Sequence, residues 1–190
     1  VVAILDALPD APTAQAWTNH VNAGGTLVLM LKPGIEAAWH GPASEALEKL
    51  LPSRPFAADH GKVLRFAPAA AARQDASMAD LLSNAAVLEG LRAARIVHMA
   101  VEDQRSTGLL IASMAGDERA SVDRSGLLYL KRVGAGRVFT WSCIPDGVNT
   151  NLGTHPMFLP LLVNQCLRPL HTSFAGNAQV GELLSWPHAR

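Results

Sequence analysis

Two apolar runs near the start of the chain predict buried strands. Val1–Leu5 and Thr26–Leu31 are almost entirely aliphatic, which is typical of strands covered on both faces. Thr13 can cap a helix between them, and Gly24 stands where a glycine commonly follows a helix end. The apolar positions on one face of that helix are Ala14, Trp17 and Val21. A strand, a helix and a strand with short connections predict a βαβ unit with parallel strands.

The rest of the chain continues to alternate between helical and extended patterns. Helices are predicted at Ser44–Leu51, within Met78–Leu91 and at Pro156–Leu167. Strands are predicted at Lys62–Phe66, Arg95–Val101, Gly108–Met114, Leu127–Val133, Arg137–Cys143 and Gln179–Leu184. The glycines Gly134 and Gly136 predict a hairpin turn between two of these strands.

This alternation predicts an α/β domain of three layers, with a mainly parallel twisted sheet and helices on both faces. The antiparallel hairpin Leu127–Cys143 is expected to extend that sheet. We place the domain at residues 1–175 and interpret residues 176–190 as a linker or the start of a β-rich domain. The chain begins inside a strand and without Met, so we interpret it as a piece of a longer protein.

The amino-acid composition limits the classes of molecule that this domain is expected to bind. Of the 190 residues, 49% are hydrophobic and only 17% are charged, which predicts a well-buried core. Sixteen basic residues balance sixteen acidic ones, so no overall field attracts nucleic acid or a lipid surface. No apolar run approaches the roughly 20 residues that span a bilayer. The expected partners are other domains of the same chain or protein subunits.

Cys143 and His155 are the residues that could support catalysis. A nucleophilic thiol needs a base nearby and an electropositive setting. Cys143 ends a predicted strand without flanking glycines, so a structural role is favoured. His155 precedes Pro156 and Met157, and a helix cap made by His155 or Thr154 is favoured over a general base. Spacing leaves open whether Cys143 and Cys166 are free thiols.

No cofactor or metal is predicted. Gly134-Ala135-Gly136 resembles part of a dinucleotide loop, but a strand rather than a helix follows it. None of the seven histidines is placed four residues from another, the spacing that one helix face needs for a metal.

A ligand cleft, if the domain has one, is expected outside the carboxyl ends of the parallel strands. Asp6 and Lys32 end two of these strands, and Asp146 and Asn149 lie in the loop Ile144–Thr154 that could face them.

Several segments together resemble a known family. These are the strand, helix and Gly24-Gly25 opening, the Gly134-Ala135-Gly136-Arg137 hairpin, and the helix starting at His155-Pro156-Met157-Phe158. They are similar to the class I glutamine amidotransferase-like domain of large bacterial membrane proteins, which have two N-terminal transmembrane helices and often a von Willebrand factor A-like domain. The resemblance implies a flavodoxin-like fold, a membrane tether in the full protein and no established reaction. Amidotransferases carry a cysteine elbow and His-Pro-Glu, whereas this chain lacks the elbow and has Met157 in place of the glutamate.

We therefore predict a non-catalytic structural or protein-interaction module of a membrane-anchored bacterial protein. The alternative is an amidase or hydrolase that uses Cys143 with His155.

Overall fold

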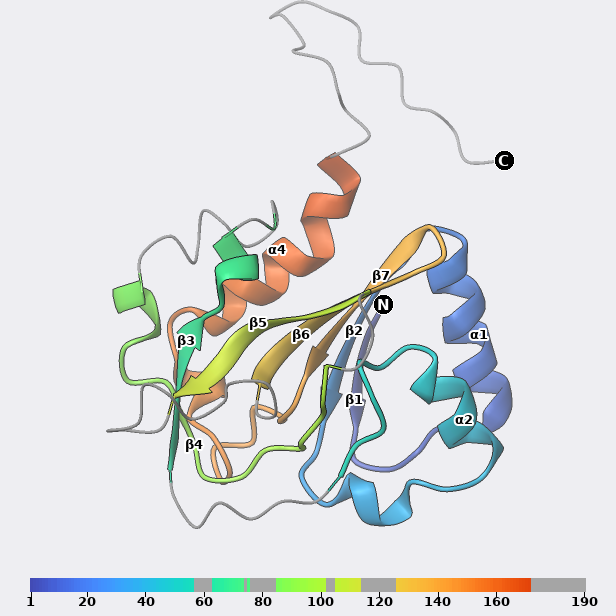
Figure 1. Ribbon diagram of the computed structural model, residues 1–190, viewed down its shortest axis with the longest axis horizontal. Coiled ribbons are helices and arrows are strands. Elements are labelled where there is room, and N and C mark those ends of the chain that lie inside the picture. Colours follow the sequence, from blue (N-terminus) through green and yellow to red (C-terminus); the bar gives the residue numbers. More distant parts are fainter. Residues whose placement is uncertain (57–62, 74, 76–84, 102–104, 114–125, 172–190) are drawn as a thin grey trace, which may run out of the picture.

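The computed structural model describes residues 1–56, 63–73, 75, 85–101, 105–113 and 126–171. Its strands form one sheet, and helices pack against both faces of that sheet (Figure 1). In chain order they are β1 (Val2–Leu5), α1 (Ala11–Asn22), β2 (Thr26–Leu31), η1 (Ile35–Ala38), α2 (Pro42–Glu48), β3 (Leu64–Pro68), η2 (Ala70–Arg73), η3 (Ala85–Leu88), β4 (Arg92–Ala93), β5 (Ser106–Ser113), β6 (Gly126–Val133), β7 (Gly136–Trp141), η5 (Leu152–Thr154) and α4 (Phe158–His171).

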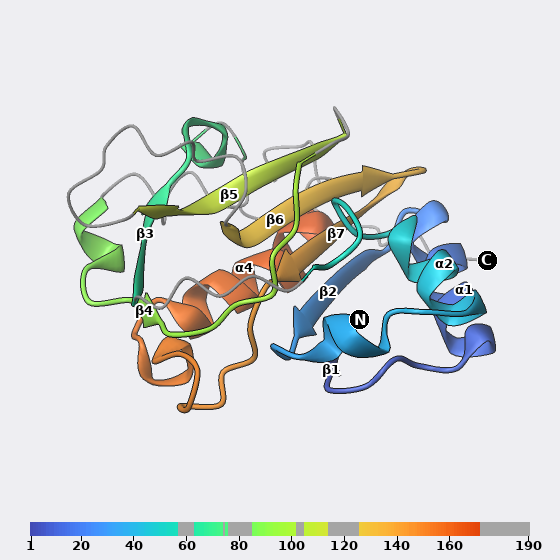
Figure 2. The same cartoon turned by 60° about the horizontal axis from the view of Figure 1, so that its bottom comes forward.

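The sheet is mixed, with strand order β1-β2-β7-β6-β5-β3-β4. The pairs β1–β2 and β2–β7 are parallel, whereas β7–β6, β6–β5, β5–β3 and β3–β4 are antiparallel. The sheet also curls, so that β3 and β4 turn away from the plane of β1 and β2 (Figure 2). The prediction of a mainly parallel, flavodoxin-like and amidotransferase-like three-layer sandwich was therefore wrong. An unbroken apolar run is typical of parallel strands, but β6 is buried along residues 126–130 and pairs antiparallel on both sides, so the run by itself does not fix the direction of the neighbouring strand.

The N-terminal strand pair is parallel, as predicted. Helix α1 between the two strands begins at Ala11 rather than after Thr13. Its N-cap is Asp10, whose carboxylate accepts a hydrogen bond from the Thr13 N–H at 2.9 Å. Gly24 follows the helix with φ of 103°, a left-handed conformation that glycine adopts without strain.

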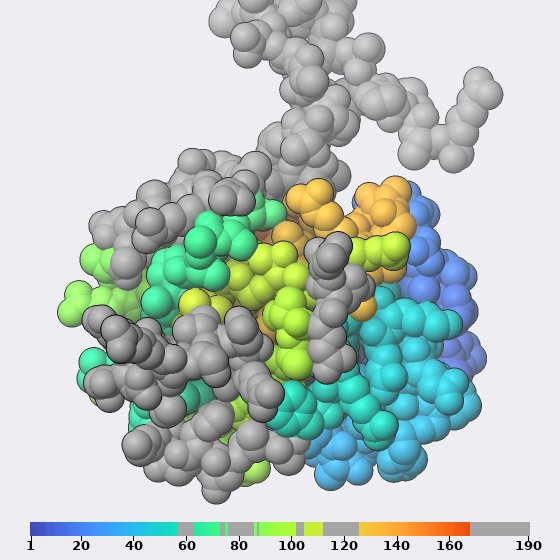
Figure 3. All heavy atoms as spheres, viewed as in Figure 1, coloured from blue at the N-terminus to red at the C-terminus, as the bar shows by residue number. Residues whose placement is uncertain are grey.

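The predicted hairpin exists as β6 and β7, but it occupies the middle of the sheet rather than extending it. Strand β7 pairs with β2 on one side and with β6 on the other. The hairpin tip lies against the end of α1 (Figure 3), where the Ala135 N–H donates to the Asn22 carbonyl at 3.3 Å. This contact fixes the hairpin to the βαβ unit.

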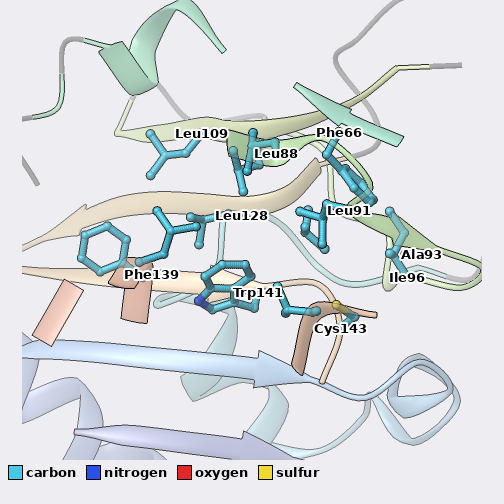
Figure 4. Close-up of a cluster of buried hydrophobic side chains, with 14 of the residues drawn as sticks. Phe66, Leu88, Leu91, Ala93, Ile96, Leu109, Leu128, Phe139, Trp141 and Cys143 are labelled. Atoms are coloured by element: carbon cyan, nitrogen blue, oxygen red, sulfur yellow. The ribbon is translucent and has the colours of Figure 1, made fainter. Parts of the chain in front are cut away.

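Two hydrophobic cores lie on the two faces of the sheet. One is built with α1 and α2 and contains alternate residues of β2 together with Val138, Trp39 and Leu47. The other lies inside the curl and under α4, and contains Phe139, Trp141, and residues of β3, β5 and β6 (Figure 4). Because side chains alternate along β7, this one strand contributes to both cores.

The predicted strand Arg95–Val101 was wrong. This segment runs extended and has one isolated bridge, from His98 to Phe56. Its Val97 N–H donates to the Ser142 carbonyl at 2.7 Å. Ile96 is buried in one core and Val97 in the other, so the apolar pattern arises from burial between two layers without a continuous strand partner.

The remaining predictions differ mainly in their boundaries. Ser44–Leu51 corresponds to α2, Lys62–Phe66 to β3, Gly108–Met114 to β5 and Pro156–Leu167 to α4. Of Met78–Leu91, residues 85–88 form the short helix η3, and residues 78–84 lie outside the described residues. Gln179–Leu184, and with it the proposed unit 176–190, also lies outside them.

Gly136 is required by close backbone contacts, which gives a prediction about stability. A Cβ at this position would overlap the carbonyl oxygens of Val21 and Gly25. We expect Gly136→Ala to lower the free energy of unfolding by about 2 kcal/mol or more. Moving Gly25 would break the hydrogen bond that its carbonyl accepts from Arg137, and moving Val21 would distort the last turn of α1. Urea denaturation checks this. Gly108→Ala is the control, since its Cβ would meet the Ile111 side chain at 3.4 Å and should cost less than about 1 kcal/mol. Equal losses for the two variants would contradict the argument.

Candidate functional site

The loop that follows β7 is hydrogen-bonded to the segment around β4. The Ala94 N–H donates to the Asn149 carbonyl at 2.7 Å, and the Thr150 hydroxyl donates to the Arg92 carbonyl at 2.9 Å. The Arg92 N–H donates to the Asn151 side chain at 2.8 Å. Since β4 is the last strand of the sheet, these bonds join its far edge to the chain leaving β7 and close the curl.

Asp146 and Asn149, predicted as cleft residues, fix a turn within this loop. One Asp146 oxygen accepts from the N–H groups of Val148 and Asn149 at 3.0 and 2.9 Å, and the other accepts from the Asn149 side-chain amide at 2.6 Å. Burial alone would raise the pKa of the Asp146 carboxyl, but the hydrogen bonds from Asn149 and Val148 outweigh it and lower the pKa. Both side chains are thus committed to local structure.

Asp6 and Lys32 lie where the sequence predicted them, directly after the parallel strands β1 and β2. Both are exposed. Neither lines any of three surface cavities of about 260–290 Å³ in the described part of the chain. Within the same residues, no group of three His, Cys, Asp or Glu side chains could hold a metal ion.

Cys143 is enclosed by the core. Its side chain is 0% exposed and packs in the cluster that contains Trp141, Ala93 and Ile96 (Figure 4). Burial raises the pKa of the Cys143 thiol from an ordinary value of 9.0 to about 12, although a hydrogen bond with Thr150 acts in the opposite direction. At neutral pH the sulfur is therefore a thiol rather than the thiolate that a nucleophile needs. Cys143 and Cys166 are both free cysteines.

His155 acts as a structural cap. Its Nδ1 accepts from the Met157 N–H at 3.4 Å, which leaves the proton on Nε2 to be donated to the Glu89 carbonyl at 3.2 Å. The His155 carbonyl also accepts from the Phe158 N–H at the first residue of α4. Both ring nitrogens have main-chain partners, so the geometry does not support pairing His155 with the Cys143 thiol as a general base. The predicted helix cap is observed at His155.

The prediction that Val1–Leu5 is buried was wrong, because β1 is the edge strand of the sheet and one of its apolar faces is exposed. Val2 is 46% exposed and Ile4 is 58% exposed. Their register partners Val28 and Met30 belong to the core under α4, so both side chains lie on the α4 side of the sheet. On that side α4 also exposes apolar residues at intervals of four, which are Leu159, Val163 and Leu167.

The main chain of β1 is arranged for a further strand. The carbonyls of Val1 and Leu5 accept hydrogen bonds from β2 and from the residue after it, at 2.8 and 2.9 Å. In a parallel ladder alternate residues face the neighbouring strand. Val2 and Ile4 therefore direct their N–H and C=O groups away from β2, toward the open side of the edge. A sequence cannot reveal this feature before the strand order is known.

No protein-family model matches the chain, and no curated protein matches it. Among solved structures it is similar to a cytoplasmic protein from Salmonella typhimurium, with 13% identity over 88% of this chain and 70% of that one and a TM-score of 0.52. It is also similar to β-galactosidases from Rahnella sp. R3 and from Bacillus circulans, each with a TM-score of 0.47. Their identities are 10% and 14%, and the matches cover 86% and 88% of this chain. The chain spans 21% of either β-galactosidase. The first likeness shows a shared fold alone.

The curled mixed sheet corrects the description of the chain as an amidotransferase-like domain with a flavodoxin-like fold. Along the described ranges, every helix is too short or too polar to cross a membrane.

The burial of Cys143 predicts the reactivity of the two thiols. In native protein at mildly alkaline pH, a thiol reagent should label Cys166 and leave Cys143 unlabelled, because Cys143 reacts only after unfolding. Because its pKa is raised in the folded state, the stabilisation of the protonated thiol is complete below pH 9.0 and is lost as the pH rises toward about 12. Mass spectrometry of labelled peptides and alkaline denaturation check both statements. Cys166→Ser is the control, and rapid native labelling of that variant would contradict them.

The role of His155 predicts an effect on stability. His155→Ala removes the acceptor for the Met157 N–H and the donor to Glu89, and should lower the free energy of unfolding by about 1–2 kcal/mol. His155→Asn keeps a short acceptor for the helix start and should recover part of this loss. Chemical denaturation measures both variants, and an unchanged His155→Ala midpoint would be the contrary result.

Proposed function

We propose that this domain is a non-catalytic structural or protein-interaction module. The open edge of β1 is the observation that carries the proposal. Its outward main-chain groups match the hydrogen-bonding pattern of one more extended strand, and Val2 and Ile4 offer apolar side chains beside them.

The polar residues that were candidates for catalysis or ligand binding also support a non-catalytic role. Cys143 is buried as a thiol, His155 caps a helix, and Asp146 and Asn149 hold a turn. These four candidates for catalysis or ligand binding thus have structural roles, whereas Asp6 and Lys32 are exposed.

The occupant that fits β1 best is an extended segment of a protein partner, from another part of the same polypeptide or from another subunit. Main-chain pairing supplies affinity in strand addition, while alternate side chains supply selectivity. A neutral overall charge is compatible with such a partner, because apolar contact and main-chain bonds do not depend on a net field.

Ile4→Pro is the sharpest test. The Ile4 N–H points away from β2, so proline removes one donor from the open edge and leaves the ladder with β2 intact. We expect a purified partner to lose about tenfold or more in affinity by calorimetry, with stability changed by less than about 1 kcal/mol. Ile4→Val keeps the N–H and should bind as the wild type does. A photo-crosslinker at position 4 identifies the partner beforehand.

A second pair of variants separates the edge from the loop after β7. Val2→Lys places a charge on the edge and should weaken binding. Val148→Lys makes the same change in the loop Ile144–Thr154, where the side chain is 83% exposed, and tests whether this loop contributes to partner binding. Binding unaffected by both Ile4→Pro and Val2→Lys would remove β1 from the interface.

A self-associating domain, seen by light scattering, would identify a second copy as the occupant. Hydrolytic turnover abolished by Cys143→Ala would overturn the non-catalytic assignment.

A further inference from the structure

Three arginines stand side by side on neighbouring strands. Arg132 on β6 is the register partner of Arg137 on β7. On its other side, the Arg132 N–H donates to the carbonyl of Arg105, the residue that precedes β5, at 3.1 Å. Adjacent strands lie about 4.8 Å apart, so the row spans about 10 Å across the sheet.

Two surface cavities follow this row. Arg132 and Arg137 line one of about 290 Å³, and Arg105 and Arg132 line the other of about 260 Å³. Asp75 and Leu130 line both, so the cavities adjoin along the arginine row. We call them together the arginine groove. Among these lining residues three positive charges face one negative charge, which leaves an excess of two positive charges.

Arg137 is held in place before any ligand arrives. Its guanidinium lies 5.6 Å from the centre of the Phe139 ring, and its Nε donates to the Thr26 hydroxyl at 3.4 Å. Burial lowers the pKa of Arg137; Asp75 raises it and Arg132 lowers it further. Arg132 therefore repels Arg137, and Asp75 compensates in part.

Like charges opposite each other on paired strands destabilise a sheet. An anion bound between the guanidiniums would reverse the sign of this contribution. From the row, the groove and the excess of charge, we propose that the arginine groove binds the phosphate group of a small phosphorylated molecule. This site is separate from the β1 edge and does not depend on the proposed function.

The chemistry favours phosphate over a single carboxylate. A phosphate monoester carries a charge of about −1.5 to −2 at neutral pH, close to the sum of the charges of the described lining residues, whereas a carboxylate carries one charge. Its three peripheral oxygens can accept from more than one guanidinium, and arginine binds such oxygens in pairs. The two cavities leave room for a small group attached to the phosphate.

The test compares thermal unfolding in phosphate, pyrophosphate and sodium chloride at matched ionic strength. We expect saturable stabilisation of the wild type by phosphate and more strongly by pyrophosphate, with little effect of chloride. Arg132→Gln should weaken phosphate binding about tenfold or more. In chloride alone the same variant should equal or exceed the wild type in stability, because the repulsion with Arg137 and Arg105 is gone. Phosphate should then reverse this order.

Arg65→Gln is the matched control. Arg65 is also an exposed strand arginine opposite another, Arg92, but neither lines the groove. The Arg65→Gln variant should be stabilised by phosphate as much as the wild type. Arg132→Lys should show an intermediate stabilisation, because lysine keeps the charge without the planar fork of arginine. Equal phosphate responses of wild type and Arg132→Gln, or equal stabilisation of the wild type by chloride and phosphate, would overturn the proposal. A single-stranded oligonucleotide that binds more than about tenfold tighter than pyrophosphate would also overturn it, in favour of a nucleic-acid ligand.

Discussion

Strand β7 pairs in parallel with β2 and antiparallel with β6, and both hydrophobic cores depend on it. Val138 faces the core under α1 and α2, while Phe139 and Trp141 face the core under α4. The strand can occupy this position because Gly136 allows the carbonyls at the end of α1 and before β2 to approach its backbone. The parallel and antiparallel halves of the sheet therefore meet at β7.

Polar side chains that follow the carboxyl end of β7 form the hydrogen bonds that close the curl of the sheet. Asn149, Thr150 and Asn151 bind the main chain around β4, and His155 binds the carbonyl of Glu89. Buried polar groups need partners, so these side chains satisfy main-chain groups that a regular strand pair would otherwise satisfy. Cys143 is buried as a small apolar residue in the core that also contains Ala93 of β4. The loop after β7, where Asp146 and Asn149 were predicted to line a cleft, is thus a structural junction between β7 and β4.

The two surfaces proposed for recognition among the described residues differ in character. The β1 edge offers main-chain hydrogen bonds and aliphatic side chains, which suit an extended peptide segment. The arginine groove crosses β6 and β7 near the hairpin tip and offers guanidinium groups, which suit an oxyanion. Asp75, which follows η2, also lines the groove, and its negative charge balances part of the positive charge of the arginines.

The sequence determined the local elements, because hydrophobic periodicity and turn residues act over short distances. Val1–Leu5 and Thr26–Leu31 are parallel strands with a helix between them, Gly134 to Gly136 form a hairpin turn, and His155 caps α4. The tertiary structure alone decided the strand order, because the apolar run of β6 lies between antiparallel neighbours while that of β2 lies between parallel ones. It also decided the sites. Asp146 and Asn149 were predicted to face a cleft with Asp6 and Lys32 and instead bind each other. Arg105, Arg132 and Arg137 are separated along the chain and become neighbours only when three strands align in register.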